Sequence, residues 1–266
     1  MKKIFIYLFI IGLAACSTQQ KLVATAPENN MIPSGKLFTT FFQQRAAEYK
    51  ALCFQAYNIA AWRLDQSLQT PSSKPKAIVT DIDETVLDNS AYAVHQGLLG
   101  KDYDIATWAE WTALAQADTL AGALTFFNYA ASKNVEVFYI TNREEKERES
   151  TLRNLNKFGF PFADEKHLIT KSGTSSKEAR RQSVLATHEI VLLLGDNLAD
   201  FSLLFDKKTE AERLQNVQKN AAAFGEKFIM LPNANYGDWE SALYQYNYKL
   251  SLQQKDSVVR GVLKSY

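Results

Sequence analysis

The sequence predicts an α/β protein with a mostly parallel sheet core, helices on both faces of that sheet and a smaller helical lobe. Two observations predict this fold: short apolar runs alternate with stretches of helical periodicity, and polar side chains directly follow several of the runs. Alternating strands and helices favour a parallel sheet that is covered on both faces. The chain has 266 residues, 46% of them apolar, which allows one large domain or a core with a small companion.

The apolar runs define five expected strands, at residues 77–81, 135–141, 168–170, 190–196 and 228–231. Helical periodicity fills the intervals at about 119–133, 146–158, 176–187 and 206–224, and a longer helical pattern covers 37–69. We therefore expect one domain over 37–266. Its α/β core would come from about 75–86 and 119–235, and the helical lobe from about 37–70, 87–118 and 237–266.

The N-terminus, MKKIFIYLFIIGLAACSTQQ, predicts an exported lipoprotein. Two lysines, an apolar stretch over 4–13 and then small residues are the pattern of a secretory signal peptide, and the apolar stretch is too short to span a membrane. The ending Leu13-Ala14-Ala15-Cys16 resembles a bacterial lipobox, so we expect residues 1–15 to be a signal peptide and Cys16 to carry lipid. An ordinary signal peptide with a chance cysteine is the alternative.

The residues after Cys16 predict how the domain is attached. Ser17 resembles the residue that follows the cysteine in lipoproteins sorted to the outer membrane, so we expect a protein anchored there through its lipid. Residues 16–36 are polar and contain two prolines and a glycine, which is typical of a tether. Cys53, the other cysteine, lies in an apolar helical pattern and is expected to pack in the core.

Charge and histidine placement argue against two kinds of site. The chain has 30 basic and 29 acidic side chains and a net charge of +1, so no basic excess suggests a nucleic-acid polymer as a partner. His95, His167 and His188 are scattered without the spacing of a metal site, so we expect structural or surface roles for them.

Several carboxylates follow the first expected strand. Residues 77–90 read AIVTDIDETVLDNS, so an apolar run leads directly into Asp81, Asp83, Glu84 and Asp88. Crowded carboxylates repel one another, and burying each of them is unfavourable unless a partner such as a metal ion compensates the charge. The alternative is a set of solvated turn and helix-cap residues, since Asp favours helix N-termini.

Two further expected strands also end in polar residues. The run 135–141 leads into Thr141-Asn142-Arg143, and the run 190–196 ends in Gly195-Asp196, with Asp200 four residues later. In an open parallel α/β sheet, ligands bind beyond the carboxyl ends of the strands. Polar chemistry at three such ends favours a binding site over solvated caps.

These residues resemble the motifs of haloacid-dehalogenase-type phosphohydrolases, whose core is Rossmann-like. Asp81-Ile82-Asp83-Glu84-Thr85 resembles the first motif, Thr141 the second, Lys177 the third and Gly195-Asp196-x-x-x-Asp200 the fourth. The resemblance implies one Mg²⁺ per chain, held by the Asp81 and Asp196 side chains and the Asp83 backbone carbonyl. It also implies that Asp81 attacks phosphorus to form an aspartyl-phosphate, while Asp83 acts as general acid and base.

The same resemblance implies supporting residues. Thr141 and Asn142 would hydrogen-bond the phosphoryl oxygens, and Asp200 would hold the metal site from behind. Lys177 would neutralise the nucleophile and the phosphoryl charge. Lys171 also follows a strand, but the sequence SSKEAR at 175–180 looks like a capped helix start and favours Lys177.

A closer resemblance is to the bacterial class C acid phosphatases, lipoproteins also described as 5′-nucleotidases. The stretches that carry it are DIDETVLDNSAY, YITNREE, TSSKEARR, GDNLADF and LPNANYGDWE. It implies that Trp108 and Tyr236 clamp a nucleobase or another flat leaving group between their rings. The helical spacing of Trp108 and Trp111 also fits core aromatics, which is what we expect for Trp111. Glu84 and Asp88 have no assigned chemical role.

The sequence therefore predicts a Mg²⁺-dependent acid phosphatase that hydrolyses small phosphomonoesters, nucleoside 5′-monophosphates among them. One alternative is a phosphotransferase of the same fold. Another is a lipoprotein that binds phosphorylated ligands without turnover. The resemblance also favours a homodimer over a monomer.

Overall fold

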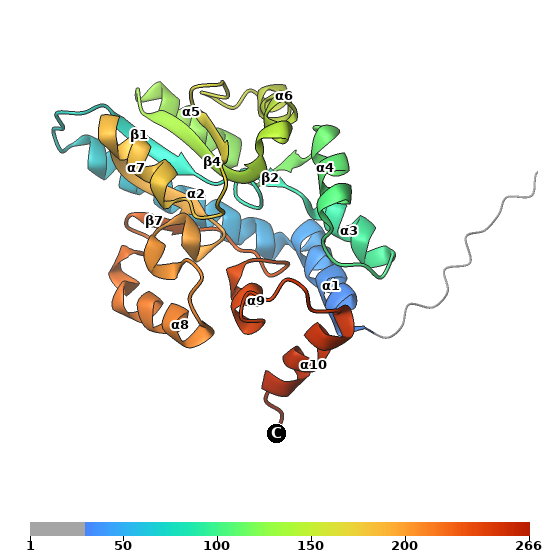
Figure 1. Cartoon of the computed structure of the whole chain (residues 1–266). Coiled ribbons are helices and arrows are strands. Elements are labelled where there is room, and N and C mark those ends of the chain that lie inside the picture. Colours follow the sequence, from blue (N-terminus) through green and yellow to red (C-terminus); the bar gives the residue numbers. More distant parts are fainter. Residues whose placement is uncertain (1–29) are drawn as a thin grey trace, which may run out of the picture.

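The computed structural model describes residues 30–266, so the expected signal peptide, Cys16 and most of the tether lie outside the described residues. At its centre, among the helices, is a sheet (Figure 1). It has five strands in the order β5-β4-β1-β6-β7, and every pairing is parallel. The strands are β1 (Lys76–Thr80), β4 (Glu136–Glu144), β5 (Leu168–Lys171), β6 (Glu189–Gly195) and β7 (Phe228–Met230). All five expected strands are present, and no end differs from the prediction by more than three residues.

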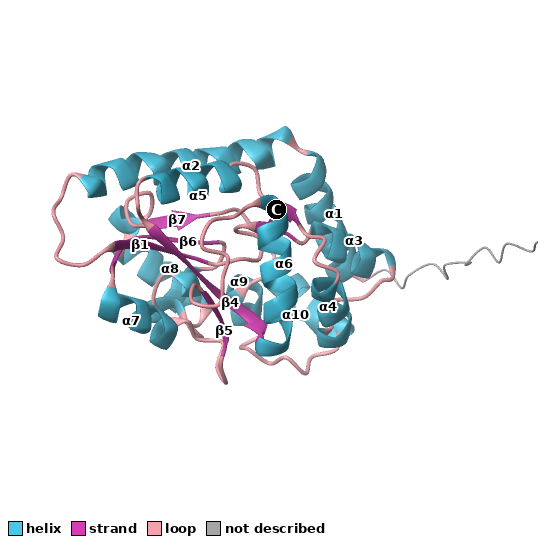
Figure 2. Cartoon of the chain, turned by 90° about the horizontal axis from the view of Figure 1, so that it is seen from above, coloured by secondary structure: helices cyan, strands magenta, loops and turns pink. Residues whose placement is uncertain are grey.

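Both faces of the sheet are apolar and covered by helices, which confirms the predicted fold class. In β1, Ile78 packs into one core layer while Ala77 and Val79 pack into the other, because successive strand side chains point to opposite faces. The first layer lies under α2 (Ala47–Leu68), α5 (Ala123–Ser132) and α6 (Arg148–Phe158), and the second lies against α7 (Glu178–Thr187). Figure 2 shows α2 and α5 on one side of the strands and α7 on the other.

The long helical pattern forms two helices, α1 (Met31–Arg45) and α2, which are separated at Ala46, where the backbone is extended. The Asn30 side chain accepts the Ile32 N–H at 3.1 Å, so α1 starts inside the expected tether instead of at residue 37. The buried side chains of α2 recur at helical spacing and pack on the sheet; they are Tyr49, Cys53, Ala56, Tyr57, Ala60 and Leu64. This corrects the predicted division, because α2 belongs to the α/β core and not to the helical lobe.

The helical lobe consists of α1, α3 (Ser90–Leu98), α4 (Ile105–Ala113), α9 (Asp238–Leu243) and α10 (Leu252–Val262). α1 packs against both α3 and α10 (Figure 1). The other elements are α8 (Glu210–Lys219), the antiparallel pair β2 (Leu87–Asp88) and β3 (Asp118–Thr119), and the 3-10 turns η1 (Glu145–Glu147), η2 (Leu198–Asp200), η3 (Leu203–Phe205) and η4 (Ala221–Ala223). Within 30–266, no helix has both the length and the apolar character that a membrane crossing requires.

Two of the histidines are part of the interior. His167 and His188 are both buried and flank the Phe138 ring, with ring centroids 4.9 Å apart in each case. Nε2 of His167 lies 2.9 Å from one Glu136 carboxylate oxygen, and Nε2 of His188 lies 3.3 Å from the other. These contacts give both side chains structural roles, in agreement with the expectation from sequence.

A largely buried ion-pair network ties the helices of the lobe together. Asp102 lies between Lys36 of α1 and Lys255 of α10, and each Nζ is 2.6 Å from a carboxylate oxygen. Lys36 also contacts Glu240 of α9 at 3.1 Å. Burial opposes ionisation of Asp102, but the two lysines outweigh it and lower the pKa of Asp102 to about 2.

We expect Asp102→Asn to lower the free energy of unfolding by about 2 kcal/mol near neutral pH, because the lowered pKa stabilises the folded state while Asp102 is ionised. This stabilisation is present above the unfolded pKa of about 4 and is lost as the pH falls toward the folded pKa of about 2. Urea denaturation at neutral and at acidic pH checks it, with the exposed Glu110→Gln as control. A difference that stays constant on acidification would contradict it.

Candidate active site

The expected strand-end residues meet at one edge of the sheet. Asp81 follows β1 and donates its backbone N–H to the Leu194 carbonyl of β6 at 3.0 Å, which brings it beside Asp196 at the end of β6. A cavity of about 750 Å³ opens here, and Asp81, Asp83 and Asp196 line it. Its volume is in the range of small-molecule sites.

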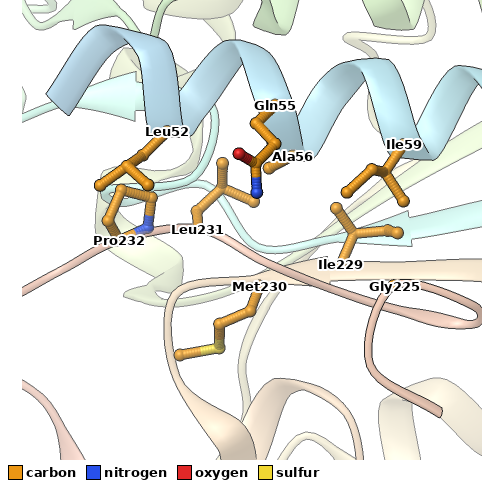
Figure 3. A pocket seen from close by; sticks show the side chains of 9 residues that line it. All are labelled: Leu52, Gln55, Ala56, Ile59, Gly225, Ile229, Met230, Leu231 and Pro232. Atoms are coloured by element: carbon orange, nitrogen blue, oxygen red, sulfur yellow. The ribbon is translucent and has the colours of Figure 1, made fainter. Parts of the chain in front are cut away.

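A smaller pocket of about 280 Å³ lies between α2 and the segment that contains β7 (Figure 3). Its lining is almost wholly apolar, with Leu52, Ile59 and Met230 among its residues and Gln55 as its only side chain with a polar group. It contains no charged group, so the larger cavity is the place for chemistry on an ionic substrate.

Lys177 is the central cation of the larger cavity. Its Nζ lies 2.6 Å from Oδ1 of Asp81 and 2.7 Å from Oδ1 of Asp200, and its side chain is 5% exposed. Burial disfavours the charged lysine, but Asp200 and Asp81 outweigh burial and raise the pKa of Lys177. Lys171, the alternative from sequence, pairs with Glu144 at 2.7 Å instead. The structure thus places Lys177, immediately before α7, against the predicted nucleophile.

Three carboxylates beside Lys177 fit a divalent cation. One oxygen each of Asp81, Asp196 and Asp200 lies within 4.8 Å of the other two. Burial raises the pKa of Asp81 to about 7. The Lys177 charge lowers this pKa, and the charges of Asp200 and Asp83 raise it further. Burial and the charges of Asp200 and Asp81 raise the pKa of Asp196 well above its usual value. One lysine does not balance this many acids, and an all-oxygen site of this kind suits Mg²⁺.

Both oxygens of Asp200 have protein partners, as do those of Asp196, which accept from Thr85 at 3.3 Å and Asn233 at 2.8 Å, but Asp200 alone of the two pairs with Lys177. Lys177 contacts Oδ1, and Oδ2 accepts the Asn197 N–H at 3.0 Å. Gly195 lies against this side chain so closely that an added Cβ would collide with the Asp200 carboxylate. The arrangement suits the supporting role that the resemblance implies for Asp200, and it explains why a glycine precedes Asp196.

Asp83 is held by a residue that the sequence did not assign. Nη2 of Arg143 donates to Oδ1 of Asp83 at 2.7 Å, and Nε donates to the same oxygen at 3.0 Å. Arg143 is 2% exposed, and burial of its charge is outweighed by Asp83, which raises the pKa of Arg143. The sequence showed Arg143 directly after the second motif, but not that it reaches across to the first.

Thr141 and Asn142, the residues predicted to hydrogen-bond the phosphoryl oxygens, differ in whether they reach the cavity. Thr141 is fully buried, accepts the Arg143 N–H at 3.1 Å and is not among the residues that line the cavity. Asn142 lines the cavity, and Nη2 of Arg180 donates to its Oδ1 at 2.7 Å. Because a guanidinium only donates, the Asn142 oxygen must face Arg180, which leaves its amide NH₂ to donate to a ligand.

Both expected clamp residues line the larger cavity. The Trp108 ring packs edge-on against Tyr92, with centroids 5.1 Å apart, and the Arg143 guanidinium lies 5.8 Å from its centroid. The Tyr236 hydroxyl donates to Glu84, an acid that the sequence left unassigned. Burial and then the charge of Asp83 raise the pKa of Glu84 to about 8. Glu84 therefore links the first motif to the loop that presents Tyr236.

Comparison with known proteins agrees with this geometry. A family model described as the HAD superfamily, subfamily IIIB (acid phosphatase), matches residues 12–239. The chain belongs to this family. The class C acid phosphatase from Bacillus anthracis is 42% identical, with a TM-score of 0.86 and coverage of 88% of this chain and 99% of that chain. Its structure with tungstate bound matches equally well. The predicted family is confirmed, and the predicted enzyme class, a phosphoric monoester hydrolase, is that of the family.

A curated relative matches a smaller part of the chain. The stem 31 kDa glycoprotein from Glycine max is 29% identical over 136 residues, which cover 49% of this chain and 53% of that protein. The chain thus spans about half the length of this curated relative.

We expect Gly195→Ala to weaken Mg²⁺ binding about 10-fold or more, because the added methyl group must displace the Asp200 carboxylate that supports the site. Calorimetric titration with Mg²⁺ measures the change. Gly35→Ala is the matched control, because nothing lies within 4 Å of the position of its added Cβ. Equal Mg²⁺ affinities for the two variants would contradict the role given to Asp200.

Proposed function

We propose that this chain hydrolyses small phosphomonoesters, nucleoside 5′-monophosphates among them, with Mg²⁺ as cofactor and through an aspartyl-phosphate on Asp81. The observation that supports this most strongly is the buried contact of Lys177 with both Asp81 and Asp200, beside carboxylates that can hold a divalent cation. Phosphate esters are anionic, so a site that hydrolyses them needs positive charge, which Lys177 and a bound divalent cation would supply together.

The residues support a reaction in two halves. First, an Asp81 oxygen bonds to phosphorus while the bond to the leaving oxygen breaks, and Asp83 gives that oxygen a proton. Then Asp83 takes a proton from water, the water oxygen bonds to phosphorus, and the bond to Asp81 breaks to release phosphate. Throughout, the Lys177 ammonium offsets the negative charge of the phosphoryl group, and the Asn142 amide donates a hydrogen bond to one of its oxygens.

The proposed metal would be held by Asp81, Asp196 and the Asp83 backbone carbonyl, with Asp200 in support. Bound Mg²⁺ would supply positive charge to the phosphoryl oxygens and keep the carboxylates ionised. The tungstate complex of the Bacillus anthracis enzyme is consistent with an oxyanion site, since tungstate is tetrahedral like phosphate.

We expect Asp81→Asn to lower kcat at least about 1,000-fold, because an amide cannot form the intermediate. Removal of metal by EDTA should abolish wild-type turnover, and added Mg²⁺ should restore it. Turnover of p-nitrophenyl phosphate and AMP measures both effects, with the exposed Asp118→Asn as control. Activity that survives both the substitution and metal removal would refute the mechanism.

The aromatic residues of the cavity predict how the leaving group is recognised. We expect Trp108→Ala to raise KM for AMP about 10-fold, because stacking on a base contributes about 1–3 kcal/mol, and to leave KM for an alkyl phosphate nearly unchanged. Steady-state kinetics on both substrates measure this. Trp62→Ala, on an exposed part of α2 outside this cavity, is the matched control. Equal losses on AMP and the alkyl phosphate would remove the clamp assignment.

A further inference from the structure

Asn89 stands at the start of α3 but does not cap it. An Asn in this position ordinarily accepts an N–H from the first turn of the helix. Here the Asn89 side chain makes no such bond, and Oδ1 of Asp88 accepts the Ser90 N–H at 2.8 Å instead. Asn89 is 2% exposed, so its amide must find partners inside the protein.

Trp111 determines the orientation of that amide. Its Nε1 donates to Oδ1 of Asn89 at 2.9 Å, and Nη2 of Arg143 faces the same oxygen at 3.5 Å. An indole N–H and a guanidinium can only donate. The Asn89 oxygen must therefore face them, and its NH₂ group points away, where it donates to Oδ1 of Asp83 at 2.9 Å.

The two oxygens of Asp83 are consequently unlike. Oδ1 accepts from Asn89 Nδ2 and from Nε and Nη2 of Arg143, at 2.9, 3.0 and 2.7 Å. Oδ2 receives only longer contacts, from Arg143 Nε at 3.2 Å and Thr141 Oγ1 at 3.5 Å. Since Oδ1 is saturated with donors, Oδ2 is the oxygen that can carry a proton.

We propose that Trp111 and Asn89 are positioning residues for the reaction. Trp111 sets the Asn89 amide, and Asn89 together with Arg143 holds Asp83 so that Oδ2 is presented to the leaving oxygen. Trp111 thereby has a role beyond packing against the core, where its ring also lies. The inference rests on the proposed function, because it requires Asp83 to be the general acid.

The positioning role is tested by how strongly the loss of kcat/KM in a variant depends on the leaving group of the ester. An alkyl phosphate needs a proton on its leaving oxygen, whereas p-nitrophenolate leaves without one. The comparison uses kcat/KM, which reports steps up to phosphoryl transfer and omits the later attack of water. A merely structural defect lowers kcat/KM for both esters alike. A displaced Trp108 ring would lower kcat/KM more for the aromatic ester, whereas a misplaced Asp83 lowers it more for the alkyl ester.

We expect Trp111→Phe, which keeps an aromatic ring and removes the N–H, to lower kcat/KM for ethyl phosphate about 10-fold. The loss for p-nitrophenyl phosphate should stay below about twofold. Asn89→Ser, which retains a residue suited to a helix start, should likewise lower the ratio of kcat/KM for ethyl phosphate to kcat/KM for p-nitrophenyl phosphate. Trp62→Phe, exposed and outside the cavity, is the control, and thermal unfolding of each variant is measured alongside.

Asp83→Asn separates this inference from the proposed function. If Asp83→Asn abolishes turnover of ethyl phosphate but Trp111→Phe and Asn89→Ser leave the ratio of the two esters unchanged, the positioning role is refuted and Asp83 remains the acid. If Asp83→Asn retains full kcat/KM on ethyl phosphate, the acid assignment fails and the positioning role fails with it.

Discussion

The whole site depends on one ammonium group placed between two carboxylates. Nζ of Lys177 contacts Asp81 and Asp200 at under 3 Å, in a region where all three side chains are largely buried. Without this cation, the acids at the ends of β1 and β6 would be driven to protonate, and a protonated Asp81 is no nucleophile. Lys177 alone leaves excess negative charge, and that excess is what makes the site suited to a divalent cation.

Residues at the start of α7 make several of the contacts that hold the site together. Lys177 immediately precedes α7, and Arg180, one turn later, donates to the Thr141 carbonyl at 2.5 Å and to Asn142 Oδ1 at 2.7 Å. The start of α7 thus joins the end of β4 to the acids after β1 and β6. Packing of Val184 in the layer beneath the sheet holds the helix in place. The geometry of the site is therefore set by the same burial that stabilises the core.

The sequence predicted the parts of the site that follow from strand ends. Asp81, Asn142 and Asp196 come directly after or within buried strands, and the carboxyl ends of parallel strands converge. It could not predict contacts between distant segments, such as Arg143 on Asp83, or Tyr236 on Glu84. The same limit explains the misplaced α2. An amphipathic helical pattern predicts a buried face, but it does not say whether that face packs on the sheet or in the lobe.

The most direct test of this account is chemical trapping of the intermediate on Asp81. The enzyme would be quenched during turnover with Mg²⁺ and a fast phosphomonoester, then reduced with borohydride, which converts an aspartyl-phosphate to homoserine. Peptide mass spectrometry should find homoserine at position 81, and not in the Asp81→Asn variant. Trapping at another residue, or a phosphoryl group found on a histidine, would contradict the account.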